Sequence, residues 1–284
     1  MKILLIGHSI VDNVENNIYP GGVYYSLLGF LSNFKPNDEI YLLTSWNKKY
    51  LFLFEKLYSL ANLKFSEIVE QMPEVILFTS GDEERREIYK NISSNLPLNK
   101  IENIKSFDGI LINMITGFDL SLEQIKFLRE NYSGKIYFDI HTLSRGIDEN
   151  MKREFRPIPK IDEWLNCIDI LQCNVNELRT IYNGSEEESA KFVLNLGVKI
   201  ILITKAEKGS VAYFMKENKL QKIEAQPFKV DSKNKIGCGD IFGATFFYHF
   251  LQTNDLQLSI QKANKAGAIA ASIQNLSTLK RLPL

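Results

Sequence analysis

The stretch NKIGCGDIFGATFFY, residues 234–248, joins a glycine-rich turn directly to an apolar helix. Gly237 and Gly239 let backbone N–H groups turn inward and converge, because glycine tolerates φ values that other residues avoid. The first turn of the helix adds N–H groups without intrahelical partners and the positive end of the helix dipole. Such a turn suits a phosphate group. Asp240, at the join, is placed to take a proton from a group that reacts beside that phosphate.

A purely structural interpretation of the same stretch stays open at this point. Gly-x-Gly before a helix is often a tight connection, and Asp commonly stabilises the first turn of a helix. Short motifs of this kind have a high false-positive rate. The rest of the chain must therefore decide between the two interpretations.

Composition narrows the class of protein. The 284 residues are 45% hydrophobic and 24% charged, and 34 Lys and Arg balance 34 Asp and Glu. A chain without basic excess is not expected to bind nucleic acid or an acidic membrane surface. No apolar run reaches the length of a membrane span or of a secretory signal. Three cysteines without metal-ligand spacing are typical of a reducing compartment, so we expect a cytoplasmic protein.

Strands and helices are predicted to alternate along most of the chain. We expect strands over residues 2–6, 40–44, 75–79, 87–89, 109–114, 135–140, 168–173 and 199–204, helices over 23–34, 49–60, 121–131, 161–165, 176–182, 186–196, 241–252 and 256–274, and a hairpin formed by 210–214 and 220–225. This order predicts a single α/β domain over residues 1–284, with a mostly parallel sheet covered by helices on both faces.

Polar residues and glycines follow several of the predicted strands. In parallel α/β sheets, ligands bind beyond the carboxyl ends of the strands. Each such residue alone also has a structural explanation as a cap or turn. His8 and His141 follow strand ends and could touch a ligand, whereas His249 is expected to pack within its apolar helix. The strand-end set is Gly7, Asp12, Asn113, Asp139, His141, Asn174, Glu177, Thr204 and the turn 237–240.

In the order and spacing of its motifs, the chain resembles the PfkB/ribokinase family of carbohydrate and nucleoside kinases. Gly-Cys-Gly-Asp at 237–240 resembles the family's Gly-Ala-Gly-Asp, and Pro-Gly-Gly at 20–22 is similar to its amino-terminal Gly-Gly motif. Asn-Val-Asn-Glu at 174–177 matches its Asn-x-x-Glu element. The resemblance covers most of the chain and implies a ribokinase-like three-layer α/β/α fold with a small β lid, here built from residues near 12–22 and 75–99.

The resemblance also implies a reaction, namely phosphoryl transfer from ATP to a hydroxyl of a sugar or sugar-like compound. Asp240 would be the base, and the N–H groups of Gly237, Cys238 and Gly239 would form an anion hole. Glu177, with Asn174, would hold Mg²⁺, largely through water. The implied substrate-binding residues are Asp12, Gly21, Gly22, Ser26, Asp139 and His141, and the implied nucleotide-binding residues are Asn174, Thr204, Ala206, Gly209 and Asn264.

The chain departs from the family pattern at several positions. Asn234-Lys235-Ile236 replaces Asp-Thr-x, with loss of a carboxylate that helps to organise a monovalent-cation site, so cation activation is not expected. Ala206 replaces the first glycine of Thr-x-Gly-x-x-Gly, and Ser26 stands where an Asn often contacts the sugar. Only eight residues separate Asp12 from Gly21, too few for the usual first lid hairpin, so we expect a reduced lid.

Two alternatives to a sugar kinase stay open, and the departures at Asn234 and Ala206 motivate the first of them. One is a non-catalytic relative that senses a nucleotide or sugar, and the other is a nucleoside kinase. Retention of Asp240 and Glu177 favours catalysis. A reduced lid could also leave a sheet edge that needs cover, which a homodimer would supply.

Overall fold

The runs predicted as strands lie side by side in one large sheet of the computed structural model, which describes residues 1–78 and 86–284. Strands β4, β1, β9, β10, β13 and β14 are parallel to one another, and the antiparallel hairpin of β15 and β16 closes one edge by pairing antiparallel with β14. The spatial order is β16 (Lys219–Ala225), β15 (Ser210–Lys216), β14 (Ile200–Thr204), β13 (Ile170–Asn174), β10 (Lys135–Asp139), β9 (Gly109–Asn113), β1 (Lys2–Ile6) and β4 (Glu39–Leu43).

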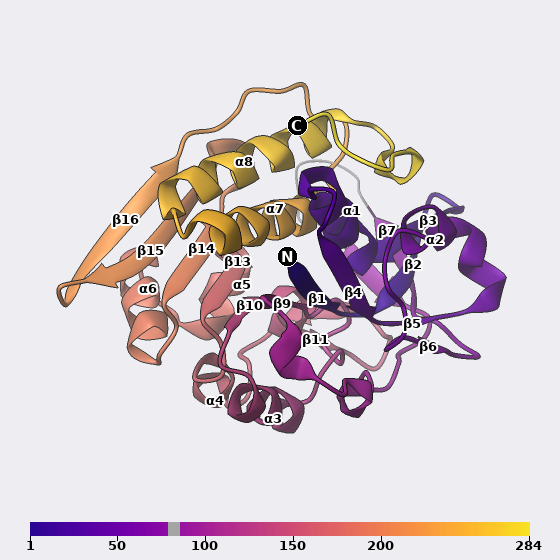
Figure 1. Cartoon of the computed structure of the whole chain (residues 1–284), viewed down its shortest axis with the longest axis horizontal. Coiled ribbons are helices and arrows are strands. Elements are labelled where there is room, and N and C mark those ends of the chain that lie inside the picture. The colour runs from indigo at the N-terminus through magenta and orange to yellow at the C-terminus, as the bar shows by residue number, and fades with distance from the viewer. Residues whose placement is uncertain (79–85) are drawn as a thin grey trace.

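Helices cover both faces of this sheet, which gives the three layers seen in Figure 1. Alternate side chains of each strand point to opposite faces, so Ile3 and Leu5 of β1 pack in one core while Leu4 and Ile6 pack in the other. The first face carries α1 (Val23–Asn33), α2 (Leu51–Tyr58), α7 (Cys238–Thr253) and α8 (Leu256–Ser272), and the second carries α3 (Leu122–Asn131), α4 (Ile161–Leu165), α5 (Val175–Ile181) and α6 (Glu186–Asn195). The predicted fold class is confirmed.

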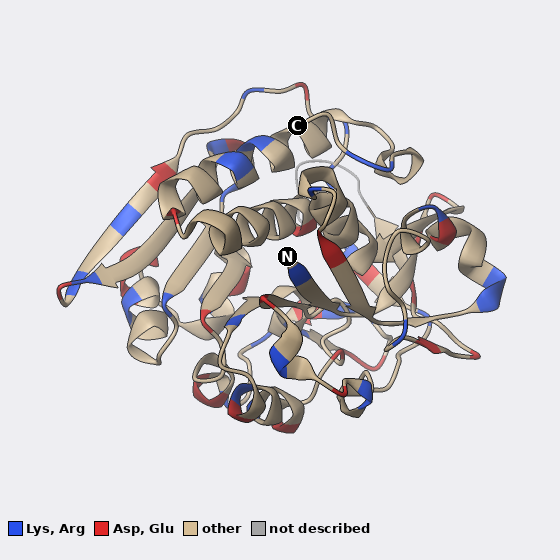
Figure 2. Cartoon of the chain, viewed as in Figure 1, with Lys and Arg blue, Asp and Glu red and all other residues tan. Residues whose placement is uncertain are grey.

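Charged residues are spread over the outside of these layers. Figure 2 shows acidic and basic residues interspersed on the outer helices and on the β15–β16 hairpin, while the central strands are mostly uncharged. This distribution agrees with the formal net charge of zero. No helix among the described residues is long and apolar enough to cross a membrane.

A second, small sheet stands beside β1 and contains a hairpin that we did not expect. β2 (Ser9–Val14) and β3 (Asn17–Gly22) pair antiparallel, and β2 also pairs with β7 (Glu74–Phe78), which pairs with β8 (Arg86–Tyr89). The eight residues between Asp12 and Gly21, expected to be too few for the usual first lid hairpin, form a short hairpin nonetheless. The connection is only the two residues Glu15 and Asn16, with φ of 50° and 65°, a tight turn that needs no glycine when Asn supplies one of the positive φ values.

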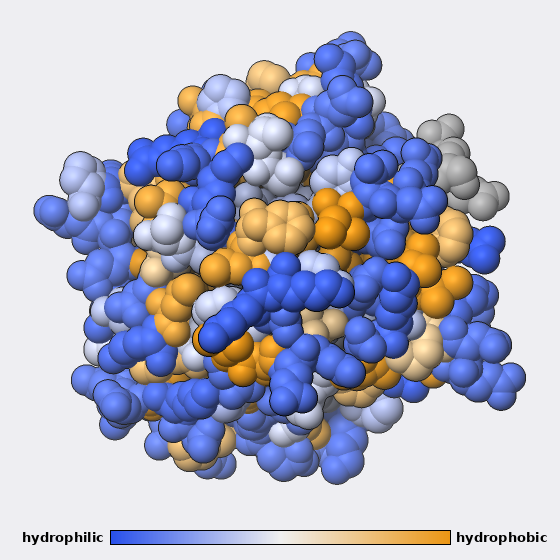
Figure 3. All heavy atoms as spheres, turned by 90° about the vertical axis from the view of Figure 1, so that its right-hand side faces the viewer, coloured by the Kyte–Doolittle hydropathy of each residue, from blue (hydrophilic) through white to orange (hydrophobic). Residues whose placement is uncertain are grey.

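The small sheet presents one face to the main domain and one outward. Asp12, Val75 and Tyr89 point inward and are buried, whereas Ile18 is 38% and Phe78 is 42% exposed. Figure 3 looks onto this side of the molecule and shows apolar areas interrupted by hydrophilic side chains. The charged run at 81–86, whose composition predicts a turn between the strands at 75–79 and 87–89, lies almost entirely outside the described residues. The reduced lid and the homodimer stay predictions.

The remaining strands form two short pairs that the sequence did not suggest. They are β5 (Ser45–Trp46) with β6 (Glu67–Ile68), and β11 (Arg145–Ile147) with β12 (Arg153–Phe155). Strands of two or three residues are too short to show a periodic pattern.

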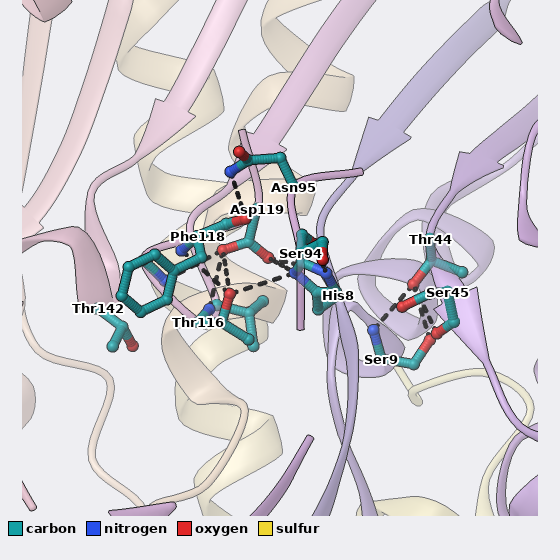
Figure 4. A network of polar contacts seen from close by, with 12 residues as sticks. His8, Ser9, Thr44, Ser45, Ser94, Asn95, Thr116, Phe118, Asp119 and Thr142 are labelled. Atoms are coloured by element: carbon teal, nitrogen blue, oxygen red, sulfur yellow. Dashed lines mark hydrogen bonds and ion pairs between the residues drawn. The ribbon is translucent and has the colours of Figure 1, made fainter. Parts of the chain in front are cut away.

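A buried ion pair holds the base of the small sheet, as Figure 4 shows. His8 lies between β1 and β2 and is fully buried; its Nδ1 lies 2.9 Å from Oδ1 of Asp119, and its Nε2 lies 3.1 Å from the carbonyl oxygen of Ser94. Both ring nitrogens thus lie within hydrogen-bonding distance of protein oxygen atoms. Burial disfavours the Asp119 carboxylate, but the charge and hydrogen bonds of His8 together with backbone N–H groups hold the pKa of Asp119 below its ordinary value.

The hypothesis that His8 could touch a ligand is therefore wrong, because the ring is enclosed and both of its nitrogens already have partners within the protein. Asp119 also accepts hydrogen bonds from the backbone N–H groups of His8 and Thr116, at 2.7 and 2.8 Å. Asn95 donates to the carbonyl oxygen of Phe118 at 2.8 Å. These contacts join the segment that enters the small sheet, the segment that leaves it and the loop after β9.

Replacing His8 by Ala should destabilise the protein strongly, because it leaves the Asp119 carboxylate buried without its cation. Breaking one side of a buried pair costs about 3–5 kcal/mol. Urea unfolding measures this loss. His249→Ala is the control, since His249 is only partly buried and its Nε2 contacts Asn33 at 3.0 Å. If His8→Ala loses no more free energy of unfolding than His249→Ala, the buried His8–Asp119 ion pair does not hold the base of the small sheet.

Candidate active site

The glycine turn at 237–240 starts α7 in a conformation that requires glycine. Gly237 is the N-cap residue, with φ of 77°, and a Cβ placed on it would lie 2.4 Å from the ring of Tyr25. Both the positive φ and the contact exclude a side chain. Tyr25 belongs to α1, which follows the Gly21-Gly22 motif, so two motifs more than 200 residues apart meet here. Gly239 is exposed.

Asp240 lies in the first turn of α7 and is held from the end of β9. The amide nitrogen of Asn113 donates to Oδ1 of Asp240 and, at 3.2 Å, to Oγ of Ser26. Asn113 and Ser26 are buried, whereas Asp240 is partly exposed. Among the described residues, Oδ1 of Asn113 accepts no hydrogen bond. This buried acceptor beside Asp240 is suited to a hydroxyl group of a ligand.

Gln172 fixes the other side of the turn. Its amide nitrogen donates to the carbonyl oxygen of Gly239 at 3.1 Å and to Oδ2 of Asp139 at 2.9 Å, and its amide oxygen accepts from the Tyr137 hydroxyl. Tyr137 belongs to β10, Gln172 to β13 and Gly239 to α7. The carbonyl of Gly239 is thus tied down toward the sheet.

The small sheet brings the predicted substrate-binding residues to the same edge. Asp12 is buried on β2, and a Cβ on Gly21 would lie 2.4 Å from Oδ2 of Asp12, so the carboxylate rests against the Gly21 backbone. Gly22 has φ of 67°, and a Cβ there would lie 2.1 Å from the carbonyl oxygen of His8. Gly22 is the N-cap residue of α1, so the chain passes directly from the small sheet into the helix that contacts Gly237.

The charges of two other carboxylates act on Asp139, at the end of β10. Asp139 is buried, and burial, followed by the charges of Glu177 and Asp240, raises its pKa well above the ordinary value. The backbone N–H of His141 hydrogen-bonds to Asp139 and opposes this shift. A divalent cation would relieve the repulsion among these carboxylates.

The predicted Mg²⁺ would have to be held here largely through water. Among the described residues, no three His, Cys, Asp or Glu side chains converge closely enough to form a metal cage. Magnesium keeps several water ligands in proteins, so widely spaced carboxylates can hold it through water. Asp139, Glu177 and Asp240 are the residues that would do so.

The Asn-x-x-Glu element also has a structural role, because it caps α5. Oδ1 of Asn174 accepts from the N–H of Asn176 and Glu177 at 2.8 and 2.9 Å, and Oε2 of Glu177 accepts from the N–H of Asn174 at 2.8 Å. This reciprocal pair is a capping box. It fixes the Glu177 carboxylate near Asp139, so the cap and a metal-holding role are compatible.

His141 is only partly buried and has φ of 33°, an unusual value for a residue that is not glycine. Its Nδ1 lies 2.6 Å from Oγ1 of Thr142. The backbone N–H of His141 thus hydrogen-bonds to Asp139, while its ring lies against Thr142 in the 3₁₀ turn His141–Ser144. A direct contact of the ring with a ligand stays a prediction.

The residues predicted to contact a nucleotide gather beside α8. Thr204 ends β14 and pairs with Ser210, whose Oγ donates to Oδ1 of Asn264 at 3.3 Å. Gly209, with φ of 86°, lies against the carbonyl oxygen of Ala225. One helical turn from Asn264, a Cβ on Gly267 would lie 3.4 Å from the carbonyl oxygen of Cys238, so α8 connects this group to the glycine turn.

Ala206 has the backbone conformation of a glycine. It is exposed, opens the 3₁₀ turn Ala206–Lys208 and has φ of 50°. A left-handed conformation costs a residue other than glycine about 1–2 kcal/mol. The substitution noticed in the sequence thus leaves the turn in place and adds backbone strain.

Sequence reasoning missed two of the residues that organise the site. Asn113 was noted as a strand-end residue but was not selected for the site, and Gln172 was not noted. The available signal for Gln172 was a polar residue inside the apolar strand Ile170–Asn174. A buried polar side chain needs partners, but the sequence cannot name them.

Comparison with known proteins identifies the family of the chain. A family model described as pfkB family carbohydrate kinase matches residues 138–280, half of the chain. The chain belongs to the PfkB family of carbohydrate kinases. A ribokinase of Staphylococcus aureus (strain COL) is 29% identical over 130 residues, which are 43% of this chain and 41% of that protein. The match therefore spans less than half of the length of that relative.

Solved structures establish the ribokinase fold over the whole chain. An aminoimidazole riboside kinase from Salmonella enterica, complexed with aminoimidazole riboside and an ATP analog, superposes with a TM-score of 0.76 at 17% identity and covers 100% of this chain and 97% of that one. A pyrophosphate-dependent kinase in the ribokinase family, in a sulfate complex, superposes with a TM-score of 0.75 at 16% identity. The match covers 95% of this chain and 94% of that one. At such identities the likeness concerns the fold alone.

The raised pKa of Asp139 predicts a pH-dependent stability. Folding favours the protonated carboxyl, so its contribution is present at low pH, below the unfolded pKa near 3.9, and is lost as the pH rises through the folded pKa. Asp139→Asn, which stays neutral, should therefore gain melting temperature over the wild type as the pH rises from 5 to 8. Asp231→Asn, at an exposed site, is the control. A difference in melting temperature between Asp139→Asn and the wild type that is the same at pH 5 and pH 8 would refute the prediction.

Replacing Ala206 by Gly should stabilise the protein, because it removes the left-handed strain. The strain relieved, less the entropic cost of ordering a glycine, leaves a gain in the free energy of unfolding of about 0.5–1 kcal/mol. This corresponds to about 1–3 °C in melting temperature. Lys208→Gly in the same turn, where φ is not positive, should lower the melting temperature instead. Two variants that change the melting temperature in the same direction would contradict this account.

Proposed function

We propose that this protein transfers a phosphoryl group from ATP to a hydroxyl of a small sugar or sugar-like compound. The observation that supports this most directly is the position of Asp240. Its carboxylate lies at the N-terminus of α7, beside the exposed backbone of Gly239 and next to the buried acceptor of Asn113. A base, an anion-binding turn and a hydroxyl acceptor thus meet at one point.

In this mechanism Asp240 accepts the proton of the attacking hydroxyl. The first N–H groups of α7 lack intrahelical partners and point away from the helix. Those at 237–239 stabilise the negative charge that grows on the transferred phosphoryl group. Gln172 holds the Gly239 carbonyl toward the sheet and so helps to keep the neighbouring N–H groups directed outward.

The acceptor lies between the small sheet and α1 in this proposal. Asp12, which rests on the Gly21 backbone, and Asn113 both offer oxygen acceptors to hydroxyl groups. Ser26 contacts Asn113 and positions its amide. Such a set of hydrogen-bond acceptors suits a polyhydroxylated compound, and a nucleoside, which also carries a sugar, is the second acceptor class.

The donor binds along α8, near Thr204, Gly209 and Asn264. Asp139, Glu177 and Asp240 would hold Mg²⁺, which would neutralise part of the phosphate charge when bound. Because a similar fold belongs to a pyrophosphate-dependent kinase, pyrophosphate is a donor to be tested beside ATP.

The test is consumption of ATP, or of pyrophosphate, with Mg²⁺ and a panel of sugars, sugar phosphates and nucleosides. Removing the base in Asp240→Asn should lower kcat by about 10²–10⁴-fold, while Asp231→Asn should leave it unchanged. If no acceptor supports turnover above the Asp240→Asn background, while ATP or a sugar still raises the melting temperature, the protein binds these ligands without catalysis and the proposal fails.

A further inference from the structure

The loop before the anion-binding turn is fastened to α8 by its backbone. The N–H groups of Lys233 and Asn234 both donate to the carbonyl oxygen of Ala271, at 2.8 and 3.0 Å. Gly237 follows three residues later with its fixed positive φ. The conformation of residues 234–236 therefore determines how the chain enters the turn.

The side chain of Asn234 closes this loop on itself. Its amide nitrogen donates to the carbonyl oxygen of Ile236 at 2.8 Å, and its amide oxygen accepts from the N–H of Ile236 at 3.0 Å. Exchanging the amide oxygen and nitrogen of Asn234 would place an oxygen against the Ile236 carbonyl oxygen and an NH₂ group against the Ile236 N–H. The orientation of the amide is therefore determined by its partners.

Cys238 is a second departure from the family pattern, and it contacts the same loop as Asn234. Cys238 stands where the family has Ala, and its Sγ lies 3.7 Å from the carbonyl oxygen of Asn234 and 4.0 Å from that of Ile236. A thiol is a weak hydrogen-bond donor. Two carbonyl oxygens of the loop thus face donor groups of the protein itself.

These residues do not fit the monovalent cation that the family resemblance implies. A hard cation needs converging oxygen ligands. Here the carboxylate is replaced by an amide, whose N–H group points at the Ile236 carbonyl oxygen and would repel a cation there. We propose that the Asn234 amide takes the place of the cation, and that the anion-binding turn of this protein keeps its shape without potassium or sodium.

The Asn234→Asp variant distinguishes an amide that replaces a cation from an amide that only closes a turn. The variant keeps the acceptor for the Ile236 N–H but sets a carboxylate oxygen against the Ile236 carbonyl oxygen. The resulting repulsion is of the kind that a bound cation relieves. Asn275→Asp is a matched control, because Oδ1 of Asn275 accepts from the N–H of Ser277 at 3.0 Å in an exposed turn that needs no amide donor.

The experiment compares melting temperatures in potassium chloride, sodium chloride and choline chloride at equal ionic strength. The wild type and Asn275→Asp should melt at the same temperature in all three salts. Asn234→Asp should lose about 2–4 °C in choline chloride, which corresponds to about 1 kcal/mol, and regain most of it in potassium or sodium chloride.

Three results would overturn the proposal. They are a wild type stabilised by potassium or sodium over choline, an Asn234→Asp variant as stable as the wild type in choline chloride, and a loss in Asn234→Asp that no salt restores. The last would mean that the amide closes a turn without replacing a cation.

The consequence for turnover rests on the proposed function and is tested separately. Wild-type phosphoryl transfer should proceed equally in potassium and choline chloride, and Asn234→Asp should become dependent on potassium or sodium. Potassium-stimulated turnover of the wild type would sink this inference and leave the kinase proposal standing. Absence of any turnover would sink the kinase proposal, while the melting temperatures would still decide the inference.

Discussion

The contact between Gly237 and the ring of Tyr25 is the constraint on which the site depends. It leaves no space for a Cβ at the start of α7, and it sets the distance between α7 and α1. Since α1 begins at Gly22, the same contact places the small sheet relative to the glycine turn. Asp12 and Asp240, on elements that share no hydrogen-bonded strand pair, acquire their relative position in this way.

Burial and charge are arranged differently in the two polar clusters of the molecule. At the base of the small sheet, the Asp119 carboxylate has His8 and several N–H groups as partners, so it stays charged without exposure. At the ends of β10 and β13, Asp139 faces other carboxylates, and its amide partner Gln172 carries no charge. The first cluster is complete within the protein. In the second, the charges that raise the pKa of Asp139 are both negative.

The sequence predicted those features that depend on local chemistry. The alternation of strands and helices, the capping box at Asn174 and Glu177 and the glycine start of α7 all follow from short-range rules. The β2–β3 hairpin was missed because its turn, Glu15-Asn16, lacks the usual glycine. Asn113 and Gln172 acquire their roles from partners 127 and 67 residues away, and a single sequence holds no signal for such pairings. The individual roles of the site residues are still predictions.

The sheet order has a consequence for how the protein is made. The face of the sheet that carries Ile3, Leu5 and Leu111 is covered by α1, α2, α7 and α8, and the last two are synthesised after every strand. Chains fold as they emerge from the ribosome, and exposed apolar surface is prone to aggregation. The nascent chain therefore presents a half-covered sheet until residues beyond 237 are available. The same step that covers this face also brings the glycine turn to Tyr25, so the apolar face is covered and the candidate site is formed in one event.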